Sequence, residues 1–217
     1  MKATKHLIAV VLAGAAVLPA AALAEAAAPA PLPAPAVPAH PVPASREADE
    51  RPPLPDATDE AFDEECLAAH NSFRARHGAP PLVLDDAAVA QAVQRARAAS
   101  ARDGLTRPPG PGSTGYGENR FWTATEENAP ASCAAAVQQW YEARWTGGYD
   151  WDRPGYSPDT GSFTQVVWRD TDVLGCGRAA GRPADGEAYQ TYIVCAYGPA
   201  GNVVGRFRQN VGEPVGG

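Results

Sequence analysis

The sequence predicts an α+β domain, a three-layer α-β-α sandwich in which helices cover the faces of a central antiparallel sheet. In three segments of the first two-thirds of the chain, apolar residues recur every three or four positions, as on a buried helix face. After Gly147 the sequence turns to β-branched and aromatic runs separated by Gly, Pro and Asp, which is typical of strands and turns. Helices that precede strands, instead of alternating with them, favour an antiparallel sheet.

The first helix is expected over residues 59–77. Phe62, Cys66 and Phe73 fall on one face of it, and Gly78 is a residue at which helices commonly end. The chain is therefore expected to enter the domain through an amphipathic helix.

Two further helices are expected. One begins at Asp85 or Asp86, whose carboxylate can accept hydrogen bonds from the exposed N–H groups of the first turn, and runs to Arg102. The other covers residues 132–144 and turns Trp140 toward the core.

The strands are expected in the last third of the chain. Residues 163–168 are β-branched and aromatic between turn residues, which predicts a strand. Residues 173–178 and 189–197 flank a stretch of Gly, Pro and Asp, which predicts a hairpin.

The N-terminus has the pattern of an export signal. Lys2 and Lys5 precede an apolar stretch that ends in Ala22-Leu23-Ala24, the small residues that a signal peptidase accepts. The alternative is a membrane anchor, because the apolar stretch reaches about 18 residues. Pro19 and the many alanines favour cleavage, so we expect a signal peptide over residues 1–24 and no stable membrane span after its removal.

A Pro/Ala-rich linker is expected over residues 25–55, which contain ten prolines. Proline removes backbone donors and fixes an extended conformation, so this segment is expected to act as a semi-rigid spacer. Recognition of its proline-rich sequence by a partner is the alternative. The folded domain is then expected over residues 56–217.

The charge balance limits the classes of partner. The chain has 18 basic and 25 acidic residues and a formal net charge of −7. Its arginines are scattered singly or in pairs, so we expect no nucleic-acid partner. Oligomeric state is left open by the sequence.

The four cysteines are expected to form two disulfides, because the count is even and the chain carries an export signal. Cys176 and Cys195 fall on the two arms of the predicted hairpin, and Cys66 and Cys133 fall on two predicted helices. These positions favour the pairs 176–195 and 66–133, and buried free thiols are the alternative. No pair has the two-residue spacing of a zinc knuckle.

Six short motifs, in this order, resemble the CAP superfamily of cysteine-rich secretory proteins, antigen 5 and pathogenesis-related-one proteins, also called the SCP domain. The motifs are HNSFR at 70–74, HGAPP at 77–81, GEN at 117–119, GSFTQVVW at 161–168, LGCG at 174–177 and YIVCAYGPAGN at 192–202. The resemblance covers about residues 60–211. It implies an α-β-α sandwich and a secreted protein.

The resemblance also implies a cleft lined by two His and two Glu, which holds zinc in some members. Glu118 matches the Glu of the GEN motif. Ser162 and Arg107 stand where the family has its two histidines, and Ala143 stands at the second Glu, with Glu142 one position earlier.

These departures change the expected chemistry. Serine, arginine and alanine are poor zinc ligands, so we expect no cofactor, although zinc is the group that the family suggests. An ion pair between Arg107 and Glu118 is expected to replace the metal through charge-assisted hydrogen bonds. The two histidines of the domain, His70 and His77, lie two turns apart on one helix and are expected to pack in the core.

A loop rich in Gly and Pro carries Trp145, Trp151 and Tyr156. CAP proteins have been linked to sterol and lipid binding, and these rings could line an apolar groove. The alternative is that they pin a long loop to the domain.

The sequence therefore favours an exported, non-enzymatic binding module for an apolar (lipid or sterol-like) ligand, or for a component of a cell envelope or host surface. A hydrolase acting through Glu118, with Glu142 as a second carboxylate, is one alternative. A purely structural extracellular module is another.

Overall fold

The computed structural model describes residues 51–102, 105, 115–184, 186 and 188–215. The expected signal peptide and most of the expected linker lie outside these residues, so the description concerns the domain alone. Its elements are α1 (Glu60–Arg76), β1 (Val83–Leu84), α2 (Asp86–Ser100), β2 (Gly117–Thr125), α3 (Cys133–Thr146), α4 (Gly161–Val166), β3 (Val173–Gly181), β4 (Tyr189–Gly198) and α5 (Phe207–Asn210).

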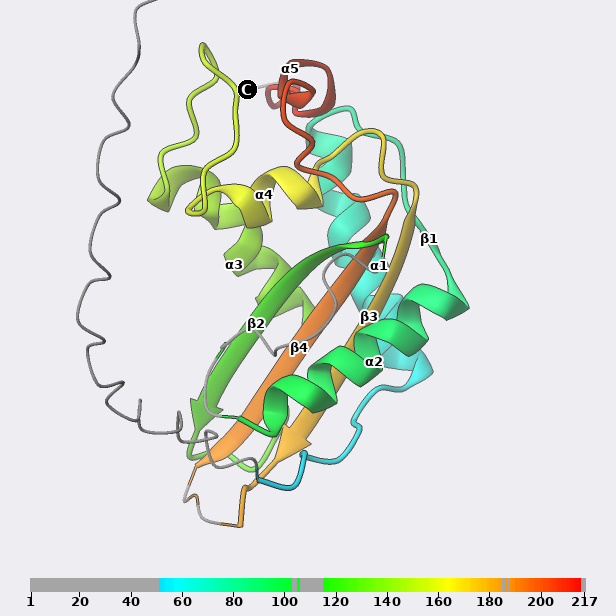
Figure 1. Ribbon diagram of the computed structural model, residues 1–217, viewed down its shortest axis with the longest axis vertical. Coiled ribbons are helices and arrows are strands. Elements are labelled where there is room, and N and C mark those ends of the chain that lie inside the picture. Colours follow the sequence, from blue (N-terminus) through cyan, green and yellow to red (C-terminus); the bar gives the residue numbers. More distant parts are fainter. Residues whose placement is uncertain (1–50, 103–104, 106–114, 185, 187, 216–217) are drawn as a thin grey trace, which may run out of the picture. The chain divides into compact units, whose positions relative to one another are not determined.

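The centre of the domain is a four-stranded sheet with the order β1-β3-β4-β2 (Figure 1). The predicted hairpin is confirmed, because β3 and β4 pair antiparallel with Cys176 opposite Cys195. β2 pairs antiparallel with the other side of β4 and forms one edge of the sheet. The short β1 pairs parallel with β3 at the opposite edge.

Helices cover both faces of this sheet, which confirms the predicted α-β-α sandwich. α2 packs on one face against β3 and β4, and the layer on the other face contains α1, α3 and α4 (Figure 1). The three long helices begin where capping predicts. The side chains of Asp59, Asp85 and Ser132 each accept a hydrogen bond from a backbone N–H three residues later.

Two glycines of β3 allow α2 to lie directly on the sheet. A Cβ atom at Gly175 would lie 2.0 Å from the backbone N of Val89, and one at Gly177 would lie 2.3 Å from the backbone N of Val93. Buried alanines on the facing side of α2, Ala88 and Ala92 among them, make the same close approach possible.

The predicted strand at 163–168 is wrong, because residues Gly161–Val166 form the helix α4. Phe163, Val166 and Val167 are fully buried, so the apolar run packs against the core as a helix turn. A short, fully buried apolar run has no periodicity that separates strand from helix, and tertiary packing decided between them here.

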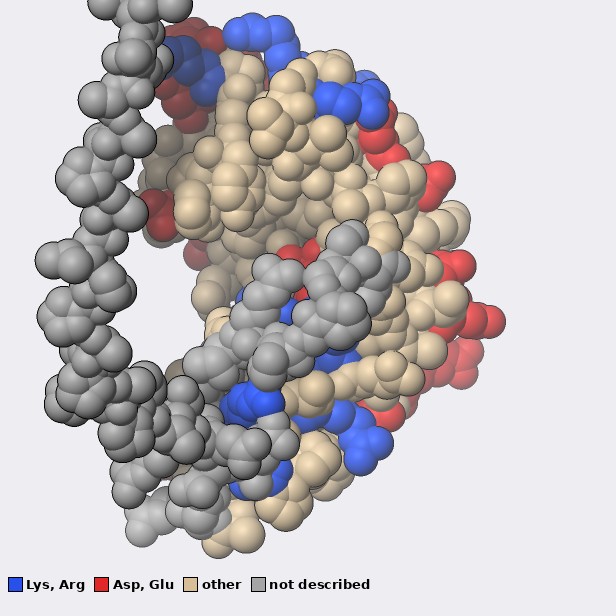
Figure 2. Space-filling view, viewed as in Figure 1, with Lys and Arg blue, Asp and Glu red and all other residues tan. Residues whose placement is uncertain are grey.

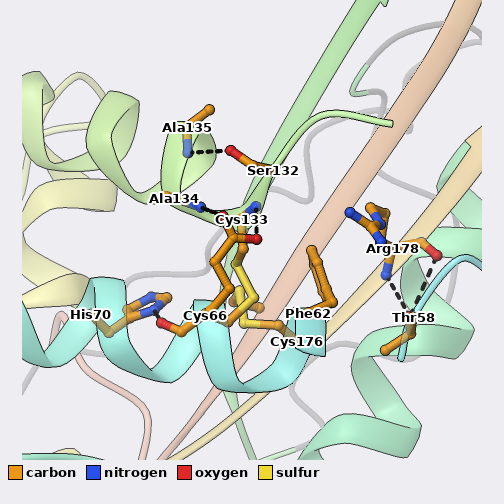
Figure 3. The surroundings of a disulfide bond; sticks show 12 residues. Thr58, Phe62, Cys66, His70, Ser132, Cys133, Ala134, Ala135, Cys176 and Arg178 are labelled. Atoms are coloured by element: carbon orange, nitrogen blue, oxygen red, sulfur yellow. Dashed lines mark hydrogen bonds between the residues drawn. A yellow bond between two sulfur atoms is a disulfide. The ribbon is translucent and has the colours of Figure 1, made fainter. Parts of the chain in front are cut away.

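Both predicted disulfides are confirmed. Cys66–Cys133 joins α1 to α3, and Cys176–Cys195 joins β3 to β4. Figure 3 shows Cys176 beside the bond between Cys66 and Cys133, and all four sulfur atoms lie within 4.8 Å of one another. The two bonds therefore lie against each other at one buried point, one within the helix layer and one within the sheet.

Candidate functional site

The carboxylate of Glu118 lies on the edge strand β2, held by two arginines. Arg120 Nε donates to Glu118 Oε1 over 2.9 Å, and Arg95 Nη2, from α2, donates to Glu118 Oε2 over 3.0 Å. The Glu118 side chain is only 20 % exposed, so water screens these ion pairs incompletely. Arg107, which the sequence suggested as the partner, lies outside the described residues.

The pKa of Glu118 reflects this environment. Burial alone acts to raise the pKa, but the hydrogen bonds and positive charges of Arg120 and Arg95 outweigh it and lower the pKa below its ordinary value. Glu118 is therefore an ionised acceptor whose two oxygens already have partners. A general acid needs the opposite shift.

Ser162 lies next to this strand, on the side of α3 and α4. Its carbonyl accepts a hydrogen bond from Asn119 Nδ2 over 3.0 Å, and its hydroxyl donates to the carbonyl of Trp140 over 3.5 Å. Among the described residues, no histidine contacts this hydroxyl, so a histidine-activated serine is absent from this part of the chain.

Glu142 lies on α3 and accepts a hydrogen bond from Gln138 one turn earlier. Across the described ranges, no hydrogen bond or shared partner connects Glu142 to Glu118.

The two histidines of the domain are core residues. His70 Nδ1 donates to the Cys66 carbonyl over 2.7 Å, and its Nε2 accepts from the Tyr197 hydroxyl over 2.8 Å. Burial lowers the pKa of His70 to about 4, so the ring is neutral near pH 7. His77 Nδ1 donates to the Gly212 carbonyl over 2.7 Å, and burial lowers its pKa as well.

The described residues around Glu118 do not fit a zinc ion. Within the described part of the chain, the four cysteines are the one group of three or more His, Cys, Asp or Glu whose ligand atoms converge, and all four form disulfides. Glu118 is engaged by arginines, and Ser162 and Ala143 supply no strong zinc ligand.

The three aromatic residues singled out in the sequence have different roles. Trp151 is partly buried and packs against His77, Tyr149 and Phe163, so it pins the loop between α3 and α4 to the core. Trp145 and Tyr156 are 64 % and 58 % exposed.

A pocket of about 170 Å³ lies in this loop. Tyr156 lines it together with Tyr149, Asp150 and Arg153, whereas neither Trp145 nor Trp151 does. Trp151 therefore holds the loop to the core, whereas Trp145 and Tyr156 are exposed at the surface.

Arg95 and Arg120 were missed in the sequence. Glu118 and Arg120 are two positions apart, which places them on one face of a strand, but the strand over 117–125 was not predicted. The approach of Arg95 depends on how α2 packs against the sheet, and no local pattern signals it.

Among the described residues, no helix has the length and apolar character needed to cross a bilayer.

Comparisons with known proteins agree with the fold. Among solved structures, the crystal structure of NaASP2 with Zn2+ covers 74 % of this chain and 92 % of its own, with a TM-score of 0.53 and 24 % identity. The structure of BmVAL-1 covers 73 % of this chain and 86 % of its own, with a TM-score of 0.54 and 17 % identity. At these identities the likeness concerns the fold alone.

Sequence relatives are closer. Golgi-associated plant pathogenesis-related protein 1 of Homo sapiens is 34 % identical over 155 residues, which cover 70 % of this chain and 94 % of the human protein. Secreted protein RBT4 of Candida albicans and protein PRY2 of Saccharomyces cerevisiae are 37 % and 33 % identical over 68 % and 69 % of this chain. The matches span only 37 % and 41 % of those two fungal proteins.

Residues 67–197 match the profile of the cysteine-rich secretory protein family, designated CAP. With this match, and with a relative above 30 % identity that is covered almost completely, the chain belongs to the CAP family.

Proposed function

We propose that this chain is an exported CAP-domain protein that works as a non-enzymatic binding module. The observation that carries the proposal is the state of Glu118, which is ionised and has both oxygens occupied by Arg95 and Arg120. A carboxylate whose pKa is lowered in this way is a poor proton donor near neutral pH, and the two guanidinium charges beside it disfavour a metal cation at the same place.

Export is supported by the bonding of the cysteines and by the relatives. Both disulfides are buried structural bonds, and such bonds persist in oxidising compartments. One relative carries the name Secreted protein RBT4. Together with the signal-like sequence of residues 1–24, these findings favour an extracellular location.

The proposed ligand is apolar, a lipid or sterol-like molecule, and contacts Trp145 and Tyr156. Both rings are more than half exposed, although most rings of the domain are buried. The loop pocket of about 170 Å³ is smaller than the roughly 300–1,000 Å³ of typical small-molecule sites. The ligand would therefore lie against the exposed rings instead of being enclosed, as a molecule in a membrane or envelope surface can.

Co-sedimentation with vesicles tests this proposal. The full chain after export is mixed with phosphatidylcholine vesicles with or without cholesterol, and the bound fraction is measured after centrifugation. We expect binding that requires cholesterol and weakens roughly tenfold in Trp145→Ala and in Tyr156→Ala, since each change removes one apolar contact.

Trp122→Ala is the matched control, because Trp122 is also exposed, at 38 %, but lies on β2. Its binding should equal that of the wild type. Absence of binding to either vesicle, or equal losses in all three variants, would contradict a ligand on the loop.

A further inference from the structure

Glu118 and Arg120 lie on one face of β2, and this face is a second candidate binding surface because it carries hydrogen-bond donors without acceptors among the described residues. Side chains two positions apart on a strand point to the same side of the sheet. Arg95 reaches this side from α2, which packs on β3 and β4. The three charged groups therefore meet between α2, which covers β3 and β4, and the edge strand β2.

This group of three carries a net positive charge. Two guanidinium groups share one carboxylate, and the side chains of Arg95, Arg120 and Glu118 are 22 %, 17 % and 20 % exposed. The partial burial reduces screening by water, so the uncompensated charge attracts an anion more strongly than a surface arginine does. The chain as a whole is acidic, with a formal net charge of −7.

The basic side chains of this face are also visible in space. Figure 2 shows Arg atoms gathered over the C-terminal half of α2 and the adjoining strands, whereas acidic atoms lie beyond the N-terminal end of that helix. An anion that approaches this face would meet the positive region around α2 and β2.

Several donors of the two arginines have no acceptor in the described part of the chain. A guanidinium carries five N–H groups, and each arginine uses one of its nitrogens on Glu118. Arg95 Nε is buried without a hydrogen-bond partner. Within the described ranges, nothing accepts from Arg95 Nη1 or from either Nη of Arg120. Polar groups left unpaired in a half-buried position indicate a missing water, ion or ligand.

We propose that Arg95 and Arg120 form a binding site for one oxyanion, the carboxylate or phosphate group of a ligand. Arginine matches such groups because its planar N–H donors can bond two oxygens at once. Glu118 positions both guanidinium groups and, as a like charge, limits the affinity for the anion. This site is independent of the proposed contact at Trp145 and Tyr156, so either proposal can fail alone.

The test is a titration of the full exported chain with inorganic phosphate and, separately, with acetate, followed through the Arg Nε–Hε cross-peaks in ¹⁵N–¹H NMR spectra. We expect saturable shifts of the Arg95 and Arg120 cross-peaks. Arg95→Gln and Arg120→Gln should each weaken binding about tenfold, the loss expected for one charge-assisted contact.

Two variants make the test specific. Arg97→Gln removes the same charge from an exposed position of α2 two residues from Arg95 and should leave binding unchanged. Glu118→Gln removes the competing negative charge and should tighten binding several-fold.

A competition experiment with vesicles distinguishes a lipid headgroup from a soluble anion as the source of the oxyanion. Phosphatidylglycerol vesicles that compete with free phosphate for the Arg95 site would assign it to a lipid headgroup, and vesicles without effect would assign it to a soluble anion. Circular dichroism confirms that each variant is folded. The proposal is overturned by the absence of saturable shifts, by equal losses in Arg97→Gln and Arg95→Gln, or by weaker binding in Glu118→Gln.

Discussion

Arg74 and Arg95 both lie on helices that cover the sheet, but their hydrogen-bond donors are used very differently. Arg74, on α1, is fully buried and donates to the carbonyls of Pro80, Val166, Trp168 and Thr171 at 2.8–3.0 Å. Among the described residues, Arg95, on α2, has Glu118 as its acceptor and a buried Nε without a partner.

This difference in donor use distinguishes a residue that holds the fold together, Arg74, from a residue of the candidate site, Arg95. The donors of Arg74 connect α1 to the segment that follows α4, and its neighbour His70 is likewise bonded on both ring nitrogens. Polar groups that satisfy one another in this way fix a structure and leave nothing for a ligand. The donors around Glu118 are incompletely matched and close to solvent, which is the condition that a binding site requires.

The largest expected effect on the free energy of unfolding is that of replacing Arg74 on α1. Arg74→Leu would leave three buried carbonyls and the part-buried carbonyl of Pro80 without their donor. Each buried carbonyl costs about 1–3 kcal/mol, so we expect the free energy of unfolding to fall by about 4 kcal/mol or more. Urea unfolding followed by circular dichroism measures it. Arg95→Gln serves as the comparison and should cost less than about 1 kcal/mol. Equal losses in the two variants would remove the distinction between the two arginines.

A second prediction uses the buried His70. The unfolded chain binds a proton at this residue near pH 6.5, whereas folded His70 binds one only near its lowered pKa of about 4. Between these values the unfolded state holds more protons, so stability falls as the pH decreases, by roughly 3 kcal/mol in total.

Urea unfolding at several pH values between 4 and 7 checks this slope. His70→Gln keeps a donor and an acceptor but does not titrate, so the slope should become shallower in that variant. Part of the slope should persist, because the pKa of His77 is also lowered by burial. An unchanged slope in His70→Gln would show that His70 is not the main titrating group.

A smaller effect is expected from Tyr197→Phe. The Tyr197 hydroxyl donates to His70 and accepts from Asn119 Nδ2 over 3.1 Å, so its removal leaves one buried acceptor bare and weakens one donor. The expected loss of unfolding free energy is about 2 kcal/mol. Tyr156→Phe, on an exposed ring, should change stability by no more than about 0.5 kcal/mol and provides the control.

The smallest effect on stability is expected at the candidate site itself. Glu118→Gln removes two partly exposed ion pairs and should cost no more than about 1 kcal/mol. Hydrolysis of ester and peptide substrates, assayed for wild type and variant in parallel, should be indistinguishable. An activity present in the wild type and lost in the folded variant would favour the hydrolase over the binding module.

The helices, the hairpin and both disulfides could be predicted because each has a local signal. Asp59, Asp85 and Ser132 mark helix starts by their capping chemistry, and the hairpin is bounded by turn residues on the inside of two apolar runs. The segment 163–168 was mispredicted because its buried run lacks a periodicity that distinguishes the two structures.

The candidate site was only partly predictable. The GEN motif identified Glu118, but its partners Arg95 and Arg120 come from the packing of α2 and from a strand that the sequence did not reveal. Contacts between elements distant in the sequence depend on the spacing of layers, and no short motif encodes that spacing.

The two glycines of β3 bear on this spacing. Gly177 lies against Val93, two residues before Arg95, and a methyl group there would meet backbone atoms of α2. α2 would then have to rise from the sheet, and the guanidinium of Arg95 would move with it. The distance between Arg95 and Glu118 therefore depends on the missing side chains of Gly175 and Gly177, which lie on a different strand. A substitution at Gly177 would change the geometry of the charged site although Gly177 is not one of its residues.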